Sequence, residues 1–555
     1  MEKIQCTVLA AALAGILSFE AVNLSAAERK IKITKRYLNF PISHKTDRRA
    51  MTLSVGGRQD CRFVIRLAEG EADYCTFRDV SRLKGKTVTL NYEGSEEALS
   101  RVMLADTITG QSAMYKERWR PQYHFTTRRG WINDPNGLVY ENGRYHLYYQ
   151  HNPYEREWEN MHWGHAVSTD MFHWQEQPLA LHPDTTGTMF SGSAVIDYDN
   201  TAGFNRKDTQ AIVVFYTADR PEYQRQCMAY STDGGMTFTK YEGNPIIESH
   251  AKWKSHDTRD PKVFWYKPGS HWVMVLNERD GHSIYTSQNL RQWTYQSHIT
   301  GFWECPELFE LPVDGGAGGR RWVMWGASGT YMTGEFDGKT FTPDGPKKQN
   351  MGGSGYAAQT FSNIPATDGR VIKMTWGRIS FDGMPFNGCM LLPQEQILKK
   401  TADGTIRLLS RPIKETEQLF DKAYEASDLS SDEANKAMQR FDGNDVLRIK
   451  AKLHLTYATD AGLNYRGQRI VSYDMNGNRL NGDFYAPFKP GSMDLDIDVY
   501  VDRGMIEMFA DDGAYSCSMK QDTGAKSKEG YTFWGREVEI KKLEVFTLKK
   551  PVWEQ

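Results

Sequence analysis

A five-fold repeat constrains this chain more than any other feature of its sequence. Each copy has an Asx, Ser or Glu turn, an apolar strand, a polar hairpin and a second, more hydrophobic strand. The copies are NDPNGLVYENGRYHLYYQ, FSGSAVIDY with AIVVFYTAD, RDPKVFWYKPGSHWVMVLNER, ECPELFELP with RRWVMWGAS, and YAAQTFSNI with RVIKMTWGRIS. They begin about 45 to 70 residues apart, which is the period of four-stranded propeller blades. A second element (STDMFHW, STDGGMTF, TSQNLRQW) recurs in phase. The pattern therefore favours an all-β chain with a five-bladed β-propeller over a β-sandwich with coincidentally spaced turns.

The starts of the five copies carry the candidate chemistry. In a propeller the first strand of each blade lines the central channel, so the corresponding strand ends meet at one mouth. These starts are Asp134, Ser191, Asp260, Glu304 and Tyr356. Three carboxylates should therefore share one funnel, and clustering like charges costs free energy unless the site uses them. A calcium cage is one possible use, but the triplet lacks a ligand-dense DxDxDG loop. We expect no metal and no cofactor.

Paired carboxylates suit glycoside hydrolysis, because one acid can protonate the leaving oxygen while an ionised one attacks or activates water. Asp134 lies beside Asn133 and Asn136 in a tight turn, whose hydrogen bonds are expected to keep it ionised. Asp134 is therefore the candidate nucleophile.

The neighbours of the other two acids suggest their roles. Glu304 lies between Trp303 and a Cys-Pro pair, an apolar setting that is expected to raise its pKa for general acid/base work. Asp260, paired with its neighbour Arg259, is expected to stay charged and to stabilise positive charge on the sugar ring.

Three motifs carry a family resemblance. WINDPNG from Trp131, RDP from Arg259 and ECP from Glu304 resemble the three signatures of glycoside hydrolase family 32, the family of invertases, inulinases and levanases. Similarity extends from about Arg118 to the C-terminus, where VDRGMIEMFADDG resembles the family's C-terminal β-sandwich. The resemblance implies retaining hydrolysis of β-fructosyl bonds in levan, inulin or fructo-oligosaccharides, with sucrose as a further candidate, and we expect mainly fructose as the product. It assigns the nucleophile, the transition-state stabiliser and the acid/base to Asp134, Asp260 and Glu304.

The resemblance also implies a set of substrate-binding residues. They are Trp131, Asn133, Gln150, Trp158, Phe190, Ser191, Arg259, Tyr356 and Trp376. Ser354 and Gln394 depart from the family pattern, which leaves substrate contacts at those two positions open.

Two other readings remain open. Related five-bladed families act on arabinose or xylose with inversion, and a catalytically silent propeller could bind glycans. The intact acid triplet disfavours a silent binder, since binding needs no acid with a shifted pKa. The motifs do not choose between β2,1 and β2,6 linkages, or between exo and endo attack. They also leave the oligomeric state open.

The rest of the chain suggests its organisation. Residues 1–27 have a short basic start, an apolar run and small residues, as expected for a signal peptide that directs export to the periplasm or medium. Residues 28–116 read as a small N-terminal β domain with a packing or a glycan-binding role. The propeller is placed at 117–405 and a β-sandwich at 406–555.

The composition of the chain disfavours two classes of binding partner, nucleic acids and anionic membranes. Lys plus Arg (68) nearly balances Asp plus Glu (70), so no basic excess favours nucleic acid or an anionic membrane surface. A later apolar run long enough to span a bilayer is missing. Spacing leaves open whether Cys61 and Cys75 form a disulfide or stay free.

Overall fold

The computed structural model describes residues 26–456, 458–485, 487, 491–524 and 530–554. Within them the chain is mostly β-structure, which confirms the predicted all-β class. Three short α-helices occur in this part: α1 (Glu96–Ser100), α2 (Ser249–Trp253) and α3 (Ser431–Met438). None of its helices is both long and apolar enough to cross a membrane. The predicted signal peptide lies outside the described residues, apart from its last two positions.

The N-terminal segment forms two small sheets on one hydrophobic core, here called the N-terminal module. Their strand orders are β1-β6-β3-β4 and β5-β2-β7. The strands are β1 (Ala27–Lys32), β2 (Tyr37–Ile42), β3 (Arg49–Val55), β4 (Arg58–Ile65), β5 (Tyr74–Asp79), β6 (Thr87–Tyr92) and β7 (Met103–Ala105). The core includes Leu38, Phe63 and, from a later part of the chain, Tyr154. Cys61 and Cys75 are both free thiols.

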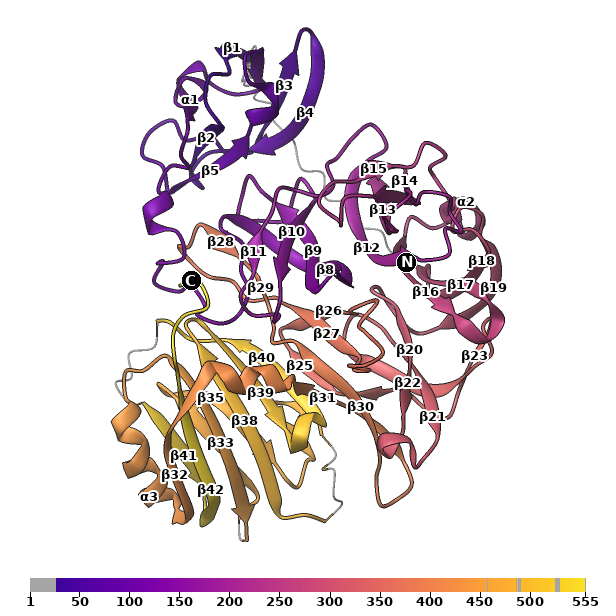
Figure 1. Cartoon of the computed structure of the whole chain (residues 1–555). Helices are drawn as coiled ribbons and strands as arrows, with labels where there is room; N and C mark the ends of the chain where they lie inside the picture. Colours follow the sequence, from indigo (N-terminus) through magenta and orange to yellow (C-terminus); the bar gives the residue numbers. More distant parts are fainter. Residues whose placement is uncertain (1–25, 457, 486, 488–490, 525–529, 555) are drawn as a thin grey trace, which may run out of the picture.

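Five sheets follow one another between residues 130 and 412, all of which the structure describes (Figure 1). The first has β8 (Gly130–Glu141), β9 (Arg144–Asn152), β10 (His162–Ser168) and β11 (Gln175–Glu176). The second has β12 (Thr188–Asp197), β13 (Ala211–Arg220), β14 (Tyr223–Ser231) and β15 (Thr239–Lys240). The third has β16 (Thr258–Tyr266), β17 (His271–Glu278), β18 (Gly281–Ser287) and β19 (Thr294–Thr300).

The last two of these sheets also carry short accessory strands. The fourth has β20 (Glu307–Pro312), β21 (Arg320–Trp325), β22 (Thr330–Phe336) and β23 (Phe341–Pro343), with β24 (Lys348–Gln349) paired to β22. The fifth has β26 (Gly355–Thr360), β27 (Ile372–Gly377), β30 (Gln394–Lys400) and β31 (Ile406–Pro412), with β29 (Cys389–Met390) paired to β27. A short strand from the same region, β28 (Phe386–Asn387), runs parallel to β8 and so joins the fifth segment to the first sheet.

A hydrophobic cluster lies between each of these sheets and the next. Successive residues of the second strands face opposite clusters, since side chains alternate along a strand. Val214 packs toward the first sheet, for example, and Phe215 toward the third. This two-sided burial explains why the second strand of each copy is the more hydrophobic one. Further clusters join the third sheet to the fourth, the fourth to the fifth, and the fifth to the first.

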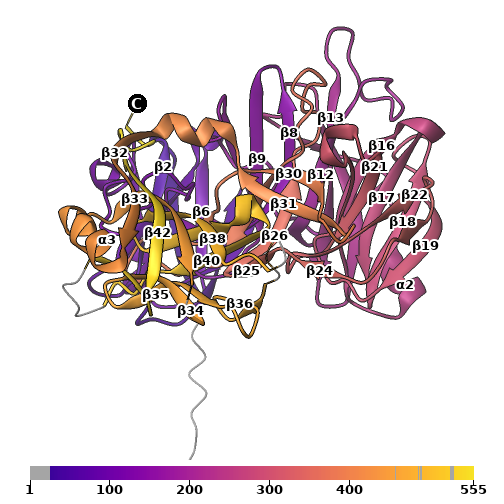
Figure 2. The ribbon, with the colours of Figure 1, turned by 90° about the horizontal axis from the view of Figure 1, so that it is seen from below.

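The C-terminal part forms two sheets that share one core, here called the C-terminal sheet pair. Their orders are β25-β40-β39-β38-β33-β42-β32 and β37-β36-β35-β34-β41. The strands are β25 (Met351–Gly353), β32 (Phe420–Ser430), β33 (Val446–Leu455), β34 (Asp460–Tyr465), β35 (Gln468–Asp474), β36 (Arg479–Leu480), β37 (Asp483–Phe484), β38 (Asp494–Asp502), β39 (Met505–Ala510), β40 (Tyr515–Lys520), β41 (Tyr531–Gly535) and β42 (Val538–Leu548). Strand β25 precedes the fifth sheet and pairs with β40, so the two parts adjoin (Figure 2).

A buried histidine fastens the C-terminal sheet pair to the start of the first sheet. His124 Nδ1 lies 2.8 Å from Asp502 Oδ2, and its Nε2 lies 3.1 Å from Glu507 Oε2. Burial opposes the charge on this imidazole, but the bonds to the two carboxylates raise the pKa of His124 to about 9. Gln394 also donates to Glu507, at 3.0 Å. Gln394, which departs from the family pattern, therefore joins β30 of the fifth sheet to the C-terminal sheet pair.

Candidate active site

One irregularity recurs where four of the first strands begin. The pairing register shifts between Ile132 and Pro135 in β8, Met189 and Gly192 in β12, Arg259 and Lys262 in β16, and Tyr356 and Gln359 in β26. Such bulges leave residues unpaired and redirect their side chains. The bulges in β8, β12 and β16 hold Asp134, Ser191 and Asp260. In the fourth sheet, Glu304 and Cys305 adopt positive φ angles of 51° and 42° just before β20 begins.

Asp134 is held by neighbours from three sheets. Ser191 Oγ donates to Asp134 Oδ2 at 2.6 Å, and Asn133 Nδ2 donates to Oδ1 at 3.1 Å. The Cys305 thiol lies 3.7 Å from Oδ2. Burial raises the pKa of Asp134 above its usual range, and the charge on Glu304 adds to this, although the bonds from Ser191 and Asn133 oppose it.

Asp260 is buried beside Asp134. The Cys305 backbone N–H donates to Asp260 Oδ2 at 2.9 Å, and the Cys305 thiol lies 3.5 Å from the same oxygen. The Asp260 backbone N–H donates to Thr217 Oγ1 at 3.1 Å, which fixes the left-handed backbone of this residue. Burial and the charges on Glu304 and Asp134 raise the pKa of Asp260 to about 7.

Glu304 has polar partners on both carboxylate oxygens. Arg259 Nε donates to Oε1 at 3.0 Å, and the Tyr356 hydroxyl donates to Oε2 at 2.6 Å. The Glu304 backbone N–H donates to Asn277 Oδ1 at 2.9 Å. The Glu304 side chain is 24% exposed, whereas Asp260 is buried. Of these two acids, Glu304 is thus the one nearer to solvent.

The structure corrects three expectations about charge. Glu304 is not in an apolar setting, because Trp303 is exposed and the carboxylate bonds Arg259 instead. Arg259 does not pair with Asp260, since its guanidinium bonds Glu304, Asp257 and Gln224. The third expectation, that hydrogen bonds of the turn keep Asp134 ionised, is also wrong, because the pKa of this carboxyl is raised.

The tight turn does not lower the pKa of Asp134. Asn136, expected to donate to this carboxylate, instead accepts a hydrogen bond from the Gly192 backbone N–H at 3.3 Å through Oδ1. The sequence neighbour Asn133 does bond Asp134, but burial and the charge on Glu304, which comes from another sheet, outweigh that bond.

Aromatic side chains extend from the acids toward the first and fifth sheets. The Tyr356 and Trp376 rings meet edge to face at 6.4 Å, and those of Trp376 and Trp131 at 5.7 Å. Trp131 Nε1 donates to Asn133 Oδ1 at 2.8 Å, so these aromatic side chains contact the sequence neighbour of Asp134. The structure therefore brings Trp131, Asn133, Tyr356 and Trp376 together with the acids.

The remaining predicted binding residues lie on the first two sheets. Trp158 is 49% exposed and meets Phe190 edge to face at 6.1 Å, and Phe190 directly precedes Ser191. Gln150 lies on β9 opposite the bulge that holds Asn133 and Asp134. The buried Gln150 Nε2 has no hydrogen-bond partner among the described residues, and neither does Trp376 Nε1.

Sequence reasoning missed two features of the site. Cys305 touches both aspartates, and its place in the ECP motif was the available signal. Beneath the acids, Lys262 Nζ pairs with Glu307 Oε1 at 2.9 Å, with both side chains buried, and bonds the Thr360 carbonyl. Lys262 follows Asp260 by two positions and Glu307 follows Glu304 by three, so closeness to the two motifs was the available signal.

The acids and the thiol also resemble a metal site in their spacing. One ligand atom each of Asp134, Asp260 and Cys305 lies within 4.8 Å of the others. Burial and the neighbouring carboxylates raise the pKa of the Cys305 thiol well above its usual range. A protonated thiol is a poor metal ligand, so this donor set is weak. A metal-free site stays a prediction.

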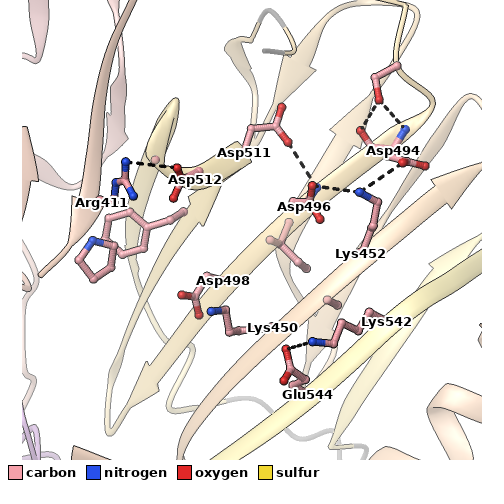
Figure 3. Close-up of a pocket in the computed structure, with 16 residues that line it drawn as sticks. Arg411, Lys450, Lys452, Asp494, Asp496, Asp498, Asp511, Asp512, Lys542 and Glu544 are labelled. Atoms are coloured by element: carbon pink, nitrogen blue, oxygen red, sulfur yellow. Dashed lines mark hydrogen bonds and ion pairs between the residues drawn. The ribbon is translucent and has the colours of Figure 1, made fainter. Parts of the chain in front are cut away.

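A separate groove, away from the acids, lies on the C-terminal sheet pair (Figure 3). This groove of about 460 Å³ is lined by charged side chains of β33, β38 and β42. Lys452 pairs with Asp494 at 3.3 Å and with Asp496 at 3.4 Å, while Lys542 pairs with Glu544 at 2.8 Å. It contains none of the acids described above, and its charges pair largely among themselves.

Comparisons with known proteins identify the family of this chain. The family model for the glycosyl hydrolases family 32 N-terminal domain matches residues 124–412. The levanase of Bacillus subtilis is 38% identical over 493 residues, covering 80% of this chain and 72% of the levanase. An extracellular exo-inulinase of Aspergillus niger is 32% identical over 507 residues, covering 75% of this chain and 93% of that protein. The crystal structure of exo-inulinase from Aspergillus awamori superposes with a TM-score of 0.68 at 26% identity, covering 79% of this chain and 99% of that one. The chain therefore belongs to glycoside hydrolase family 32.

Proposed function

We propose that this glycosidase removes terminal β-fructosyl units from levan, inulin and sucrose with retention of configuration, releasing fructose. The chain is a β-fructosidase by its family and relatives. The observation that carries the mechanism is the convergence of Asp134, Asp260 and Glu304 from three sheets. Two carboxylates on either side of a glycosidic bond suffice for double displacement.

Asp134 acts as the nucleophile. Its ionised oxygen attacks the anomeric carbon while the bond to the leaving oxygen breaks, giving a fructosyl-enzyme ester. The hydrogen bonds from Ser191 and Asn133 favour the anion and orient it. Water later attacks the same carbon and releases fructose and the free carboxylate.

Glu304 acts as the general acid and then as the base. It protonates the departing oxygen in the first step and takes a proton from water in the second. Its greater exposure supports this role, because the group must reach both the leaving group and incoming water. Tyr356 and Arg259 hold its two oxygens in place.

Asp260 stabilises the positive charge that develops on the fructosyl ring. Burial and the charges on Glu304 and Asp134 raise its pKa in the free site. Hydroxyls of a bound sugar would donate to it and favour the anion. Trp131, Gln150, Trp158, Phe190 and Trp376 form the substrate-binding surface around it.

The architecture proposed for this function is a five-bladed β-propeller. Five consecutive sheets support it, as do clusters between every neighbouring pair, including fifth to first. The propeller would run from about 117 to Pro412, because β31 pairs with β30 beyond the boundary predicted at 405. Residues 28–116 would form the N-terminal domain and the C-terminal sheet pair a β-sandwich domain.

Export by a signal peptide completes the proposal. The relatives include enzymes named as extracellular. Mass determination of the secreted protein would test this, with cleavage after Ala27 expected.

Product analysis tests the activity. The protein is incubated with levan, inulin and sucrose, and Asp134→Ala serves as the inactive control. Fructose alone from the polymers indicates exo action, whereas longer oligosaccharides indicate endo action. The relative rates on levan and inulin decide the linkage preference. Absence of fructose from all three substrates would refute the proposed function.

A further inference from the structure

We propose that the N-terminal module is a positioning device for Trp158, and thereby controls how tightly the site binds its fructoside substrate. The inference rests on the proposed function of the acid site and concerns the segment 153–160, which follows β9 and carries Trp158. This positioning role differs from the general packing role and from the glycan-binding role that the sequence suggests for residues 28–116.

The N-terminal module contacts nearly every residue of the segment 153–160. Tyr154 inserts into the module core, where its ring stacks on Phe63 at 3.7 Å between centroids. Thr76 donates to the Pro153 carbonyl, and the Arg156 backbone N–H donates to the Tyr74 hydroxyl. Hydrogen bonds to backbone groups fix the path of the chain, so this segment cannot shift without the module.

Two arginines of the module form the strongest contacts. Arg48 Nε and Arg66 Nη1 both donate to Glu155 Oε2, at 2.9 and 3.1 Å, and the Glu155 side chain is fully buried. Arg66 Nη1 also bonds Glu157 Oε2 at 3.0 Å, and Arg48 Nη1 lies 3.6 Å from Glu159. Charge-assisted bonds to a buried carboxylate are among the more rigid polar contacts in proteins.

Asn160 closes the segment at its other end. Its side chain accepts from the Val64 backbone N–H and donates to the Val64 carbonyl, both at 2.9 Å. Asn160 thus extends the edge of β4 as a strand residue would. The same amide donates to Asn152 Oδ1 at 3.1 Å, which links the module to the end of β9.

Trp158 is the exception within this segment. Among the described contacts it has none with the module, while every other residue of 153–160 has at least one. Its half-exposed ring instead meets Phe190, next to Ser191 and hence to Asp134. The module therefore fixes the backbone on both sides of Trp158 and leaves its ring free for the substrate.

The expected consequence is a change in binding rather than in chemistry. Glu155 and Arg66 touch no reacting atom, so weakening their contact should misplace Trp158 without disturbing the acids. A loss of uniform binding raises KM and leaves kcat unchanged. A glycan-binding module would behave differently, because its loss would affect polymers and spare sucrose.

The test uses the full-length enzyme with Glu155→Gln and Arg66→Ala. Arg62→Ala is the matched control, because Arg62 lies on the same strand β4 but pairs at the surface with Glu93. We expect KM for both sucrose and levan to rise about fivefold or more in the two variants, with kcat within about twofold of wild type. The Arg62→Ala variant should keep both constants. An unchanged KM in a variant with wild-type thermal stability would overturn the inference.

Asn160→Gly tests the same inference if Glu155→Gln and Arg66→Ala fail to fold. It removes the side-chain bonds to Val64, and glycine accepts the φ of 50° at this position without strain. The same rise in KM is expected. Hydrogen exchange of 153–160 should become faster in each variant. Wild-type exchange in all of them would show that the N-terminal module does not hold this segment.

A double-mutant cycle shows whether Trp158 transmits the effect. If Glu155 acts through Trp158, adding Glu155→Gln to Trp158→Ala should change KM by less than about twofold. Fully additive changes would refute transmission through Trp158. The two hypotheses fail separately, because a wild-type enzyme that releases no fructose refutes the proposed function. An active wild type whose variants keep their KM refutes only the positioning role.

Discussion

The Ser191 hydroxyl of the second sheet donates to the Asp134 carboxylate of the first at 2.6 Å, between Oγ and Oδ2. Both residues sit in strand bulges at the same place in the repeat. The bond favours the ionised form of Asp134 against the burial that raises its pKa. A contact between two sheets therefore helps to determine the charge of Asp134, the proposed nucleophile.

Ser191→Ala should shift the acidic limb of the kcat/KM profile to higher pH. Burial raises the pKa of Asp134 and the bond from Ser191 lowers it, so removing this donor should raise the pKa further. A higher pH is then needed to ionise the carboxyl group. A hydrogen bond to a charged group is worth roughly 1.5–3 kcal/mol, which corresponds to about a 10- to 100-fold loss of kcat/KM. Initial rates between pH 3 and 9 measure both effects. An unshifted limb would show that Ser191 does not tune Asp134.

Glu304→Ala and Asp134→Ala should give opposite anomers when rescued with azide. Without Glu304, a fructoside with an acidic leaving group still forms the ester on Asp134, and azide then attacks it without needing a base. Two displacements give a fructosyl azide of retained configuration. Without Asp134, azide attacks directly and one displacement gives the inverted product.

Product configuration is read by nuclear magnetic resonance. The wild-type enzyme, which should hydrolyse the same fructoside with little dependence on azide, is the control. The same anomer from both variants would reject the assignment of roles, and so would Glu304→Ala acting on inulin, levan and sucrose at the wild-type rate.

Asp260→Asn should lower kcat by roughly 100-fold or more, because an amide cannot stabilise the developing positive charge as a carboxylate does. The fold should survive, since the amide oxygen can still accept from the Cys305 backbone N–H. Steady-state kinetics and thermal melting are measured together. A variant with near-normal turnover and normal stability would remove Asp260 from the catalytic set.

His124 should make the protein less stable as the pH rises from about 6.5 to 9. The pKa of His124 is raised in the folded state, so its stabilising contribution is complete below the unfolded value near 6.5 and is lost as pH passes about 9. The contribution is at most about 3 kcal/mol. Denaturant unfolding across this range should show the fall in wild type and a flatter profile in His124→Gln. Parallel profiles would contradict it.

Lys262→Met should destabilise the protein by roughly 3–5 kcal/mol, because it leaves Glu307 buried without its cation. Adding Glu307→Leu should recover most of that loss, since the unpaired carboxylate is the main cost. Chemical denaturation of the single and double variants measures the difference. If the double variant were less stable than Lys262→Met, the ion pair would not be the source of the effect.

The sequence by itself determined the all-β class, the succession of five strand-rich copies and the acids at their starts. It could do so because alternation, turn residues and repeat spacing are local properties of the chain. The motifs around Asp134, Asp260 and Glu304 likewise identified the family, since each is a short contiguous run of residues.

Only the tertiary structure decided which groups surround each acid. Arg259 reaches Glu304 rather than its sequence neighbour Asp260, and the thiol of Cys305 lies between two aspartates. The anchoring of 153–160 by Arg48 and Arg66, residues about a hundred positions earlier, was equally invisible in the sequence. The physical reason is that electrostatic and hydrogen-bond energies depend on distances of a few ångströms. Those distances are set by how sheets pack, and sequence separation does not reveal them.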